Sequence, residues 1–328
     1  MQPPDDIPRV CAEFGPNCPY VSGSAHNFTC TAVVCTSGRP RELERCIRSL
    51  QRTNYTGLRL LVVENGRRAG AEHVAEQHGA DYLFVPRPGL SRARNEGARR
   101  AMTDLVAFID DDAVADSGWL AAACKEFCSA QVAVVTGPIL PLDDAADSPQ
   151  FSTLDLGSER RVFARSTPQW FAKANFGGIG HGSNMVFRRD LFVDSPLFDV
   201  RLGRGGPLDG ADESFAFFQL LDRGWQIVYT PDAIVRHFQH KEAQRSKRDL
   251  ARSVAYFMFL FSEARDYRRE LVQYILEALA GKRRGWRAGA ATQSRKVDYF
   301  SLIGALGSAF RMYRATRSAA SEAGVARP

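Results

Sequence analysis

The stretch FTCTAVVCTSGRPRELERCIRSL (28–50) decides the fold class, because it places a buried strand directly before an amphipathic helix. Its first part is a continuous run of β-branched and apolar residues of strand length. Such a run is typical of a strand buried on both faces of a parallel sheet. Pro40 suits the first position of a helix, and apolar residues follow at helical spacing from Leu43 to Leu50. We therefore expect a strand followed by a helix over about 39–51.

The alternation of strand and helix repeats further along the chain. Strand-like runs at 58–64, 81–86 and 104–110 are separated by helix-like segments near 70–78 and 91–102. A further helix is expected over 117–128, and the stretch HGSNMVF (181–187) is expected to form a strand. Strands that alternate with helices of this length imply right-handed βαβ crossovers. The sequence therefore predicts an α/β fold with a doubly wound, Rossmann-like, mostly parallel sheet.

Composition divides the chain into three expected parts. Residues 1–26 are rich in Pro, Asp, Gly and Ser without periodicity, which predicts a leader without regular structure. Residues 27–240 hold the α/β domain, in which the irregular segment 138–176 is expected to shape the substrate site. Residues 241–328 are predicted to form a basic, mainly helical C-terminal extension.

Positive charge is concentrated in this extension. Residues 241–328 carry 18 Lys and Arg against 8 Asp and Glu, while the whole chain has a net charge of +6. The apolar segment YFSLIGALGSAF (299–310), bracketed by Lys296 and Arg311, fits an interfacial helix as well as a buried one. We therefore expect an anionic membrane surface as a partner of the extension, with a solvated helical face as the alternative, and no nucleic-acid partner.

Two observations bear on localisation. The opening residues MQPPDDIPRV lack the cationic and apolar segments of a secretion signal. No apolar run in the sequence is long enough for a conventional membrane-spanning helix. We expect a cytoplasmic protein that can lie peripherally at the inner face of the membrane.

Ligands of doubly wound sheets bind outside the carboxyl ends of the strands, and these ends carry polar side chains here. Carboxylates are most concentrated at Asp110, Asp111 and Asp112. Adjacent carboxylates repel one another unless a counter-charge is present, and hard oxygen ligands suit Mg²⁺ or Mn²⁺. Such a cation bridges diphosphate oxygens. The alternative is that a member of the triplet caps the next helix.

Further chemistry is expected later in the chain. Asp212 and Glu213 stand at the start of a predicted helix. A carboxylate at this place either interacts favourably with the helix dipole or acts as a general base towards an acceptor hydroxyl. His237 follows a predicted strand, and its imidazole is either a metal ligand or a structural side chain.

Seven blocks follow one another along the chain: TAVVCTSGRPRELERCIRSL, LLVVENG, PGLSRARNEGARRA, DLVAFIDDDAVADSGWL, GHGSNMVFRRDLF, LGRGGPLDGADESFAFFQLLDRGW and IVYTPDAIVRH. Taken together, these blocks resemble the family 2 glycosyltransferases over about 28–240. The resemblance implies a GT-A fold and a hexosyltransferase-type, inverting transfer from a nucleoside-diphosphate sugar. The product would belong to cell-surface polysaccharide or glycolipid synthesis, with a glycan or lipid-linked acceptor.

The resemblance also implies roles for individual residues. On the donor side, Thr36 and Glu64 would line the nucleoside pocket, and Arg94 would approach the nucleotide. Asp110 would reach the ribose or diphosphate. Asp111 is grouped with these donor-binding residues without a task of its own.

On the metal and catalytic side, Asp112 would bind Mn²⁺ or Mg²⁺, with His237 as a late ligand. The base would be the second residue of the acidic pair, Glu213. The family usually has Glu-Asp where this chain has Asp-Glu, which leaves the base open between Glu213 and Asp212.

Two other functions stay open at this point. A nucleotidyltransferase uses a similar fold and acidic metal site, although the loop TSGRP (36–40) is only a partial match to a phosphate-gripping loop. A catalytically impaired scaffold that binds nucleotide sugar without turnover is the second alternative, and the reversed acidic pair is its only support.

Overall fold

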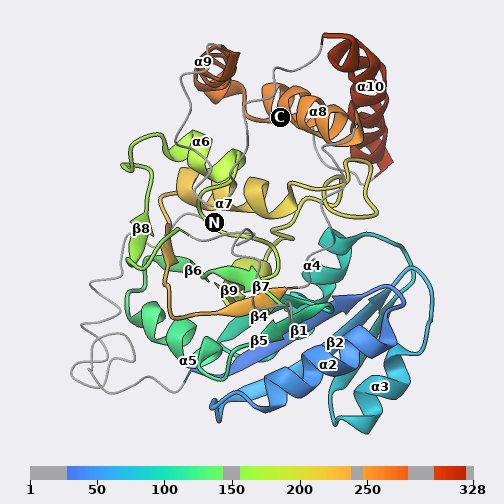
Figure 1. Cartoon of the computed structure of the whole chain (residues 1–328), viewed down its shortest axis with the longest axis vertical. Helices are drawn as coiled ribbons and strands as arrows, with labels where there is room; N and C mark the ends of the chain where they lie inside the picture. The colour runs from blue at the N-terminus through green and yellow to red at the C-terminus, as the bar shows by residue number, and fades with distance from the viewer. Residues whose placement is uncertain (1–27, 143–155, 238–246, 280–298, 323–328) are drawn as a thin grey trace.

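The computed structural model describes most of the chain, and its elements run from blue to red in Figure 1. The predicted leader, residues 1–26, lies outside the described residues. Parts of the 138–176 segment and of the C-terminal extension lie outside them as well. The described ranges are 28–142, 156–237, 247–279 and 299–322.

A central eight-stranded sheet organises the molecule. β1 pairs in parallel with β2 and β4, β2 pairs in parallel with β3, and β6 pairs in parallel with β10. The predicted α/β, mostly parallel sheet is therefore confirmed. In spatial order the strands are β3 (Asp81–Val85), β2 (Leu58–Asn65), β1 (Cys30–Thr36), β4 (Leu105–Asp110), β9 (Met185–Arg188), β6 (Val132–Thr136), β10 (Gln226–Tyr229) and β8 (Arg161–Phe163).

The strand β9 breaks the parallel pattern. It lies between β4 and β6 and is antiparallel to both. The sequence predicted a strand at this place, but its direction depends on pairing with partners far away in the chain. The apolar pattern of a strand carries no information about that direction.

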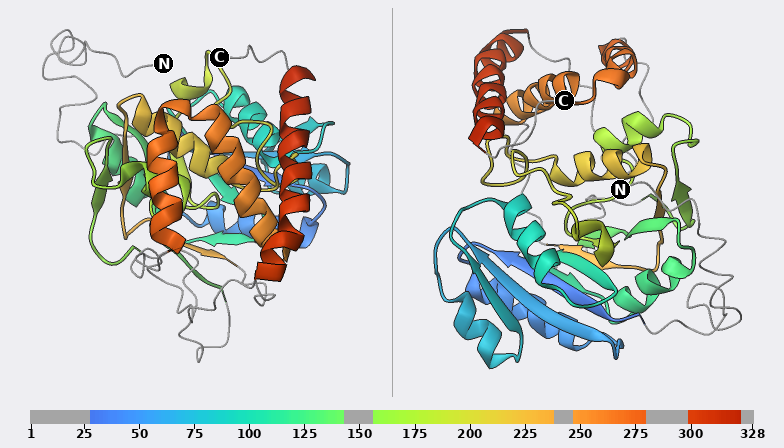
Figure 2. Two further views of the ribbon diagram at one scale, coloured as in Figure 1. Left: turned by 90° about the horizontal axis from the view of Figure 1, so that it is seen from above. Right: turned by 180° about the vertical axis from the view of Figure 1, so that it is seen from behind.

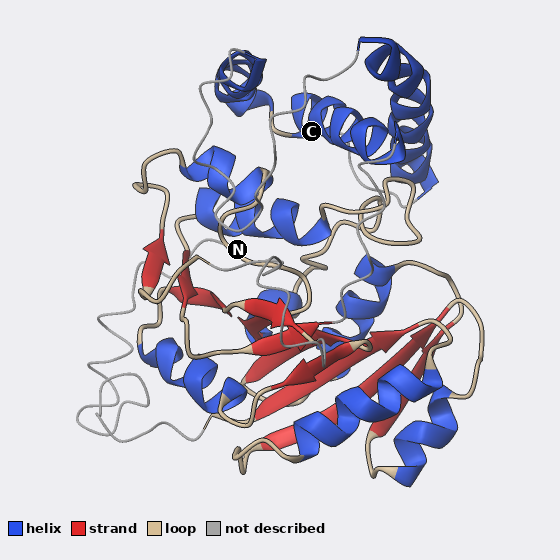
Figure 3. Cartoon of the chain, viewed as in Figure 1, coloured by secondary structure: helices blue, strands red, loops and turns tan. Residues whose placement is uncertain are grey.

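Helices cover both faces of the sheet, as the blue ribbons on either side of the red strands in Figure 3 show. Neighbouring residues of β1 explain why, because Val33 belongs to one buried cluster and Val34 to the other. The cluster of Val34 packs against α2 (Pro40–Gln51), α3 (Ala71–Gln77) and α5 (Trp119–Cys124). The cluster of Val33 packs against α4 (Leu90–Arg100), α6 (Trp170–Asn175) and α7 (Asp212–Asp222).

The helix after β4 is shorter than the sequence predicted. A single helix was expected over 117–128, whereas α5 ends at Cys124 and continues as a 3₁₀-helix over Lys125–Cys128. The difference concerns hydrogen-bond geometry, which apolar periodicity does not resolve at a helix end.

A second, three-stranded sheet brings distant parts of the chain together. It contains β5 (Ala113–Ala115), β11 (Val235–His237) and β7 (Ile139–Pro141), with β11 in the centre. β11 is antiparallel to β5 and places His237 opposite Ala113. The chain around residue 237 is thereby fixed beside the end of β4.

Three C-terminal helices lie together at the end of the molecule opposite α2 and α3 (Figures 1 and 2). Ala251, Ala255 and Phe259 of α8 are buried in the same cluster as α7, so this helix extends the core of the α/β domain. None of the described helices is long and apolar enough to cross a bilayer. The helices are α8 (Lys247–Glu263), α9 (Arg268–Leu279) and α10 (Tyr299–Glu322).

Candidate active site

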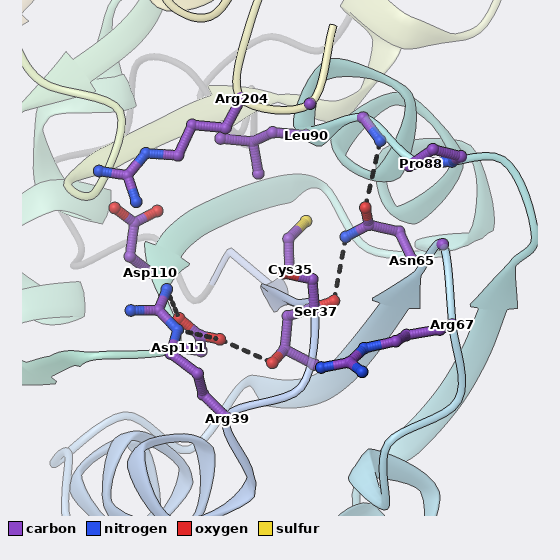
Figure 4. A pocket seen from close by; sticks show the side chains of 14 residues that line it. Cys35, Ser37, Arg39, Asn65, Arg67, Pro88, Leu90, Asp110, Asp111 and Arg204 are labelled. Carbon is purple, nitrogen blue, oxygen red and sulfur yellow. Dashed lines mark hydrogen bonds and ion pairs between the residues drawn. The ribbon is translucent and has the colours of Figure 1, made fainter.

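A pocket of about 460 Å³ opens at the carboxyl ends of β1, β2 and β4 (Figure 4). Parallel strands bring these ends to the same edge of the sheet, which is where doubly wound folds bind ligands. The loop between Leu202 and Ala211 closes the opposite side. The lining residues are Cys35, Thr36, Ser37, Arg39, Asn65, Gly66, Arg67, Pro88, Gly89, Leu90, Asp110, Asp111, Arg204 and Gly205.

Two members of the acidic triplet meet His237 at the rim of this pocket. Nε2 of His237 lies 3.0 Å from Oδ1 of Asp112 and 3.5 Å from Oδ2 of Asp110. One ligand atom of each of the three residues lies within 4.8 Å of the other two. The pairing of β5 with β11 causes this proximity, since Ala113, opposite His237, directly follows Asp112. The structure thus brings the two predicted metal ligands together and adds Asp110 to them.

The charges of this cluster favour a cation between the carboxylates. Burial opposes ionisation of Asp112, but its hydrogen bond to His237 and the charges of His237 and Arg39 hold its pKa well below the usual value. Burial also lowers the pKa of His237, yet the hydrogen bonds and charges of Asp110 and Asp112 outweigh burial and raise it to about 10. Without a metal, the two carboxylates thus stabilise a proton on His237, and a divalent cation would displace that proton. Two carboxylate oxygens and one imidazole nitrogen then form a donor set that fits Mn²⁺ or Mg²⁺.

The third carboxylate of the triplet faces another way. Oδ2 of Asp111 accepts a hydrogen bond from Oγ1 of Thr36 at 2.6 Å and one from Nε of Arg39 at 3.2 Å. Burial is the main cause that raises the pKa of Asp111 to about 6. Arg39 also forms an ion pair with Asp112. Through Thr36 and Arg39, Asp111 therefore connects the acidic triplet to the end of β1 and to the residue before α2.

Arg94 does not line the pocket, although the resemblance placed it near the nucleotide. Its side chain is only 3% exposed, and its Nη1 lies 2.6 Å from Oδ2 of Asp212. Its Nη2 donates a hydrogen bond to the carbonyl oxygen of Gly182 at 2.7 Å and lies 3.5 Å from Oδ1 of Asp110. Arg94 is thus an internal link between the acidic triplet and the start of α7.

The ion pair with Arg94 gives the two acidic residues at the start of α7 different environments. Asp212 is buried and bound to Arg94, whereas Glu213 is only half-buried. Burial, followed by the negative charge of Asp212, raises the pKa of Glu213 from its usual value to about 8. A carboxyl group with a pKa near neutrality is suited to accept a proton during a reaction. The two carboxylates therefore differ, because Asp212 is held in the ion pair with Arg94 and Glu213 has a raised pKa.

Glu64, which the resemblance placed in the nucleoside pocket, does not line it either. Its carboxylate accepts hydrogen bonds from the hydroxyl of Tyr82 at 2.6 Å and from the backbone N–H of Ala69 at 2.6 Å. The neighbouring Asn65 reaches the pocket instead, between the carbonyl of Thr36 and the N–H of Gly89. The side chain of Glu64 is long enough to reach back to the loop after β2, which explains why it does not line the pocket.

Sequence reasoning missed several residues of the site. Arg39 and Arg204 line the pocket, and His181 lies next to His237, with 6.5 Å between the ring centres. Burial is the main cause that lowers the pKa of His181. The position of Arg39 directly after the first strand was a usable signal. Arg204 and His181 stand in Gly-rich loops and gave no comparable signal.

Comparison with known proteins identifies the class to which this fold and site belong. Residues 31–194 match glycosyl transferase family 2, and the chain belongs to that family. It therefore has the GT-A fold and is a glycosyltransferase. The carboxylate and histidine cluster at the end of β4 lies at the rim of the pocket, and Arg94 connects Asp110 of this cluster to the acidic pair on α7.

Two curated relatives are moderately similar to the chain. A glucosyl-dolichyl phosphate glucuronosyltransferase of Haloferax volcanii is 26% identical over 220 residues, which cover 63% of this chain and 68% of the relative. A pre-mycofactocin glycosyltransferase of Mycobacterium tuberculosis is 29% identical over 226 residues, which cover 66% of this chain. The matched region spans less than half (44%) of the length of this second relative.

Solved structures show the same fold at low sequence identity. The mannosyltransferase PcManGT from Pyrobaculum calidifontis, in complex with GDP-Man and Mn²⁺, is 18% identical with a TM-score of 0.51 and covers 91% of this chain and 76% of its own. TarS 1–349 of S. aureus, in complex with UDP-GlcNAc, is 14% identical with a TM-score of 0.57. Its match covers 87% of this chain and 81% of its own.

Proposed function

We propose that the chain transfers a sugar from a nucleoside-diphosphate sugar to an acceptor hydroxyl, with inversion and with dependence on Mn²⁺ or Mg²⁺. The observation that carries the proposal is the cluster of Asp110, Asp112 and His237 at the rim of the strand-end pocket. Structural neighbours in complex with GDP-Man and Mn²⁺ and with UDP-GlcNAc support it.

The proposed reaction is a single in-line displacement. Glu213 accepts the proton of the acceptor hydroxyl, and the oxygen attacks the anomeric carbon from the face opposite the diphosphate. The bond between the anomeric carbon and the phosphate oxygen breaks, and the nucleoside diphosphate leaves with the electron pair. When bound by Asp110, Asp112 and His237, a divalent cation supplies positive charge to the departing diphosphate. Asp111 and Arg39 hold the pocket wall in place.

Nucleotide release tests this proposal. The purified chain would be incubated with UDP-, GDP- and dTDP-sugars and Mn²⁺, alone and with glycan or lipid-linked acceptors. We expect release with one donor class, loss of release with EDTA, and loss of release in the Asp112→Asn variant. Nucleotide-sugar binding without release under every condition would favour the impaired scaffold. Formation of a nucleoside triphosphate and a sugar 1-phosphate when pyrophosphate is added to the nucleotide sugar would favour a nucleotidyltransferase.

We further propose that the acceptor is a glycan or lipid-linked sugar of the cell envelope, reached at an anionic membrane surface. The relatives support this, since they include the dolichyl phosphate enzyme and the succinoglycan biosynthesis protein ExoM of Rhizobium meliloti. Large apolar side chains are exposed on the C-terminal helices, among them Leu276 at 60% and Phe310 at 50%. Arg311, Arg314 and Arg317 are exposed on the same helix as Phe310. Apolar and basic side chains together favour anionic lipid.

Flotation with vesicles tests the membrane proposal. Deletion of residues 241–328 is unsuitable, because α8 contributes buried side chains to the core. We expect wild-type protein to float with vesicles of phosphatidylcholine and phosphatidylglycerol and to float less at high salt. The Phe310→Glu variant should float less, and Met102→Glu, which changes a 77% exposed apolar residue outside the C-terminal helices, should behave as wild type. Absence of wild-type flotation would contradict the proposal.

A further inference from the structure

Arg204 lies in the loop that closes the pocket opposite the strand ends. The loop backbone is fixed, because the carbonyl oxygen of Arg204 accepts a hydrogen bond from the N–H of Leu90 at 2.8 Å. Gly203 and Gly205 flank it with φ angles of 86° and 77°, a left-handed conformation that favours glycine. The loop therefore presents the Arg204 side chain from a defined backbone position.

The guanidinium of Arg204 is exposed and points towards the carboxylate of Asp110 across the pocket (Figure 4). Within the described part of the chain it forms no salt bridge. Arg39, by contrast, is paired with two carboxylates. Arg204 thus carries a positive charge into the pocket, and no carboxylate among the described residues forms an ion pair with it.

Arg67 is another arginine of the pocket, and its guanidinium lies elsewhere. It follows β2, and its side chain extends towards Ser37 and Gly38 in the turn after β1 (Figure 4). A cation held by Asp110, Asp112 and His237 would attract the diphosphate to the side of the pocket where Asp110 lies, and the Arg204 guanidinium points towards Asp110 (Figure 4). Guanidinium groups bind phosphate oxygens through charge-assisted hydrogen bonds in a planar fork.

We propose that Arg204 binds the diphosphate of the nucleotide-sugar donor on the side opposite the divalent cation and stabilises the departing nucleoside diphosphate. This inference rests on the proposed function. As the bond between the anomeric carbon and the phosphate oxygen breaks, negative charge grows on the diphosphate, and the N–H groups of Arg204 donate to it.

The position of Arg204 also connects the donor to the base. Its loop leads directly into α7, and Gly203 lies so close to Asp212 that an added Cβ would stand 3.1 Å from the Asp212 Cγ. A diphosphate held by Arg204 is therefore bound by the same loop that positions Glu213. Loss of Arg204 is expected to affect both donor binding and the rate of transfer.

The test compares nucleoside diphosphates with monophosphates. Dissociation constants of UDP, UMP, GDP, GMP, dTDP and dTMP would be measured by calorimetry in the presence of Mn²⁺. For whichever base binds, Arg204→Gln should weaken the diphosphate about tenfold to a hundredfold and leave the monophosphate within about twofold. Arg204→Lys should fall between wild type and Arg204→Gln, because Lys keeps the charge but lacks the fork.

The control is Arg87→Gln, which removes an exposed arginine outside the pocket and should change none of the constants. Thermal unfolding of each variant shows whether the fold is kept. An equal loss for diphosphate and monophosphate, or no loss, in a folded Arg204→Gln variant would overturn the role of Arg204 while wild-type binding upholds the proposed function. If the wild-type chain binds none of the six nucleotides, the proposed function fails, and this inference fails with it.

Discussion

Arg94 on α4 and Asp212 on α7 form a buried ion pair, with 2.6 Å between Nη1 and Oδ2 and side chains only 3% and 4% exposed. A buried charge that loses its partner is costly, because the remaining charge is neither solvated nor neutralised. The pair therefore assigns Asp212 to the stability of the site, which separates it from the neighbouring carboxylate of Glu213.

The first prediction concerns the stability of this pair. Asp212→Asn should lower the free energy of unfolding by about 3 kcal/mol, because Arg94 keeps only the carbonyl of Gly182 and the more distant Asp110. Urea denaturation measures the change. Glu213→Gln is the matched control and should change stability little. An Asp212→Asn variant that is as stable as wild type but inactive would make Asp212 the base.

The second prediction concerns the pH dependence of transfer. The pKa of Glu213 is raised to about 8, so the carboxyl is protonated below that pH and cannot accept the acceptor's proton. The transfer rate at saturating donor should therefore rise as pH increases through about 8. Asp212→Asn removes the adjacent negative charge and should move the midpoint to lower pH. A rate that is constant between about pH 6 and 9 would contradict a role for Glu213 as base.

The third prediction tests Glu213 directly. Glu213→Gln removes the proton acceptor but leaves the pocket and the metal cluster unchanged. Transfer should fall by about a hundredfold or more, while the dissociation constant of the donor stays near that of wild type. Calorimetry and a transfer assay on the same preparation measure the two effects. Weaker donor binding with unchanged turnover would place Glu213 at the donor instead.

The fourth prediction separates the members of the acidic triplet. Asp112→Asn should weaken Mn²⁺ binding at least about tenfold, because it removes a charged ligand. Asp111→Asn is the control and should leave Mn²⁺ affinity unchanged, since Asp111 contacts Thr36 and Arg39 rather than His237. Electron paramagnetic resonance of free Mn²⁺ measures both. A larger loss in Asp111→Asn would reverse the assignment.

The fifth prediction uses a glycine at the interface of α4 and the sheet. A Cβ at Gly97 would stand 2.5 Å from Cγ1 of Val33 and 3.1 Å from Cγ2 of Val63, so Gly97→Ala should destabilise the fold by about 1–3 kcal/mol. Gly307 lies within α10 with only the end of Arg311 nearby, and Gly307→Ala should stabilise the protein slightly. Equal effects of the two substitutions on urea denaturation would contradict the packing argument.

Much of the sheet could be predicted because its strands are buried. The runs that became β1, β2, β3 and β4 are apolar and of strand length, and the helices between them contain apolar residues at helical spacing. The small sheet of β5, β7 and β11 could not be predicted. Its strands are three residues each, and a run of that length has no recognisable period.

The candidate site could be predicted only in part, and the reason is similar. Asp110 and Asp112 could be found because they stand at the end of a recognisable strand. Two other contacts could not be predicted: the hydrogen bond from Arg39 to Asp111 and the one from Tyr82 to Glu64. Both depend on side-chain directions, which residue spacing does not encode. The burial of Arg94 against Asp212 depends on a contact between helices far apart in the sequence.

The register of β5 and β11 has a consequence for how the chain acquires activity during its synthesis. Asp110 and Asp112 emerge early, but His237 joins them only after the intervening chain has folded and β11 has paired with β5. A partly synthesised chain lacks the last ligand of the proposed cation site. We therefore expect the proposed cation site to form only in a chain that extends through β11.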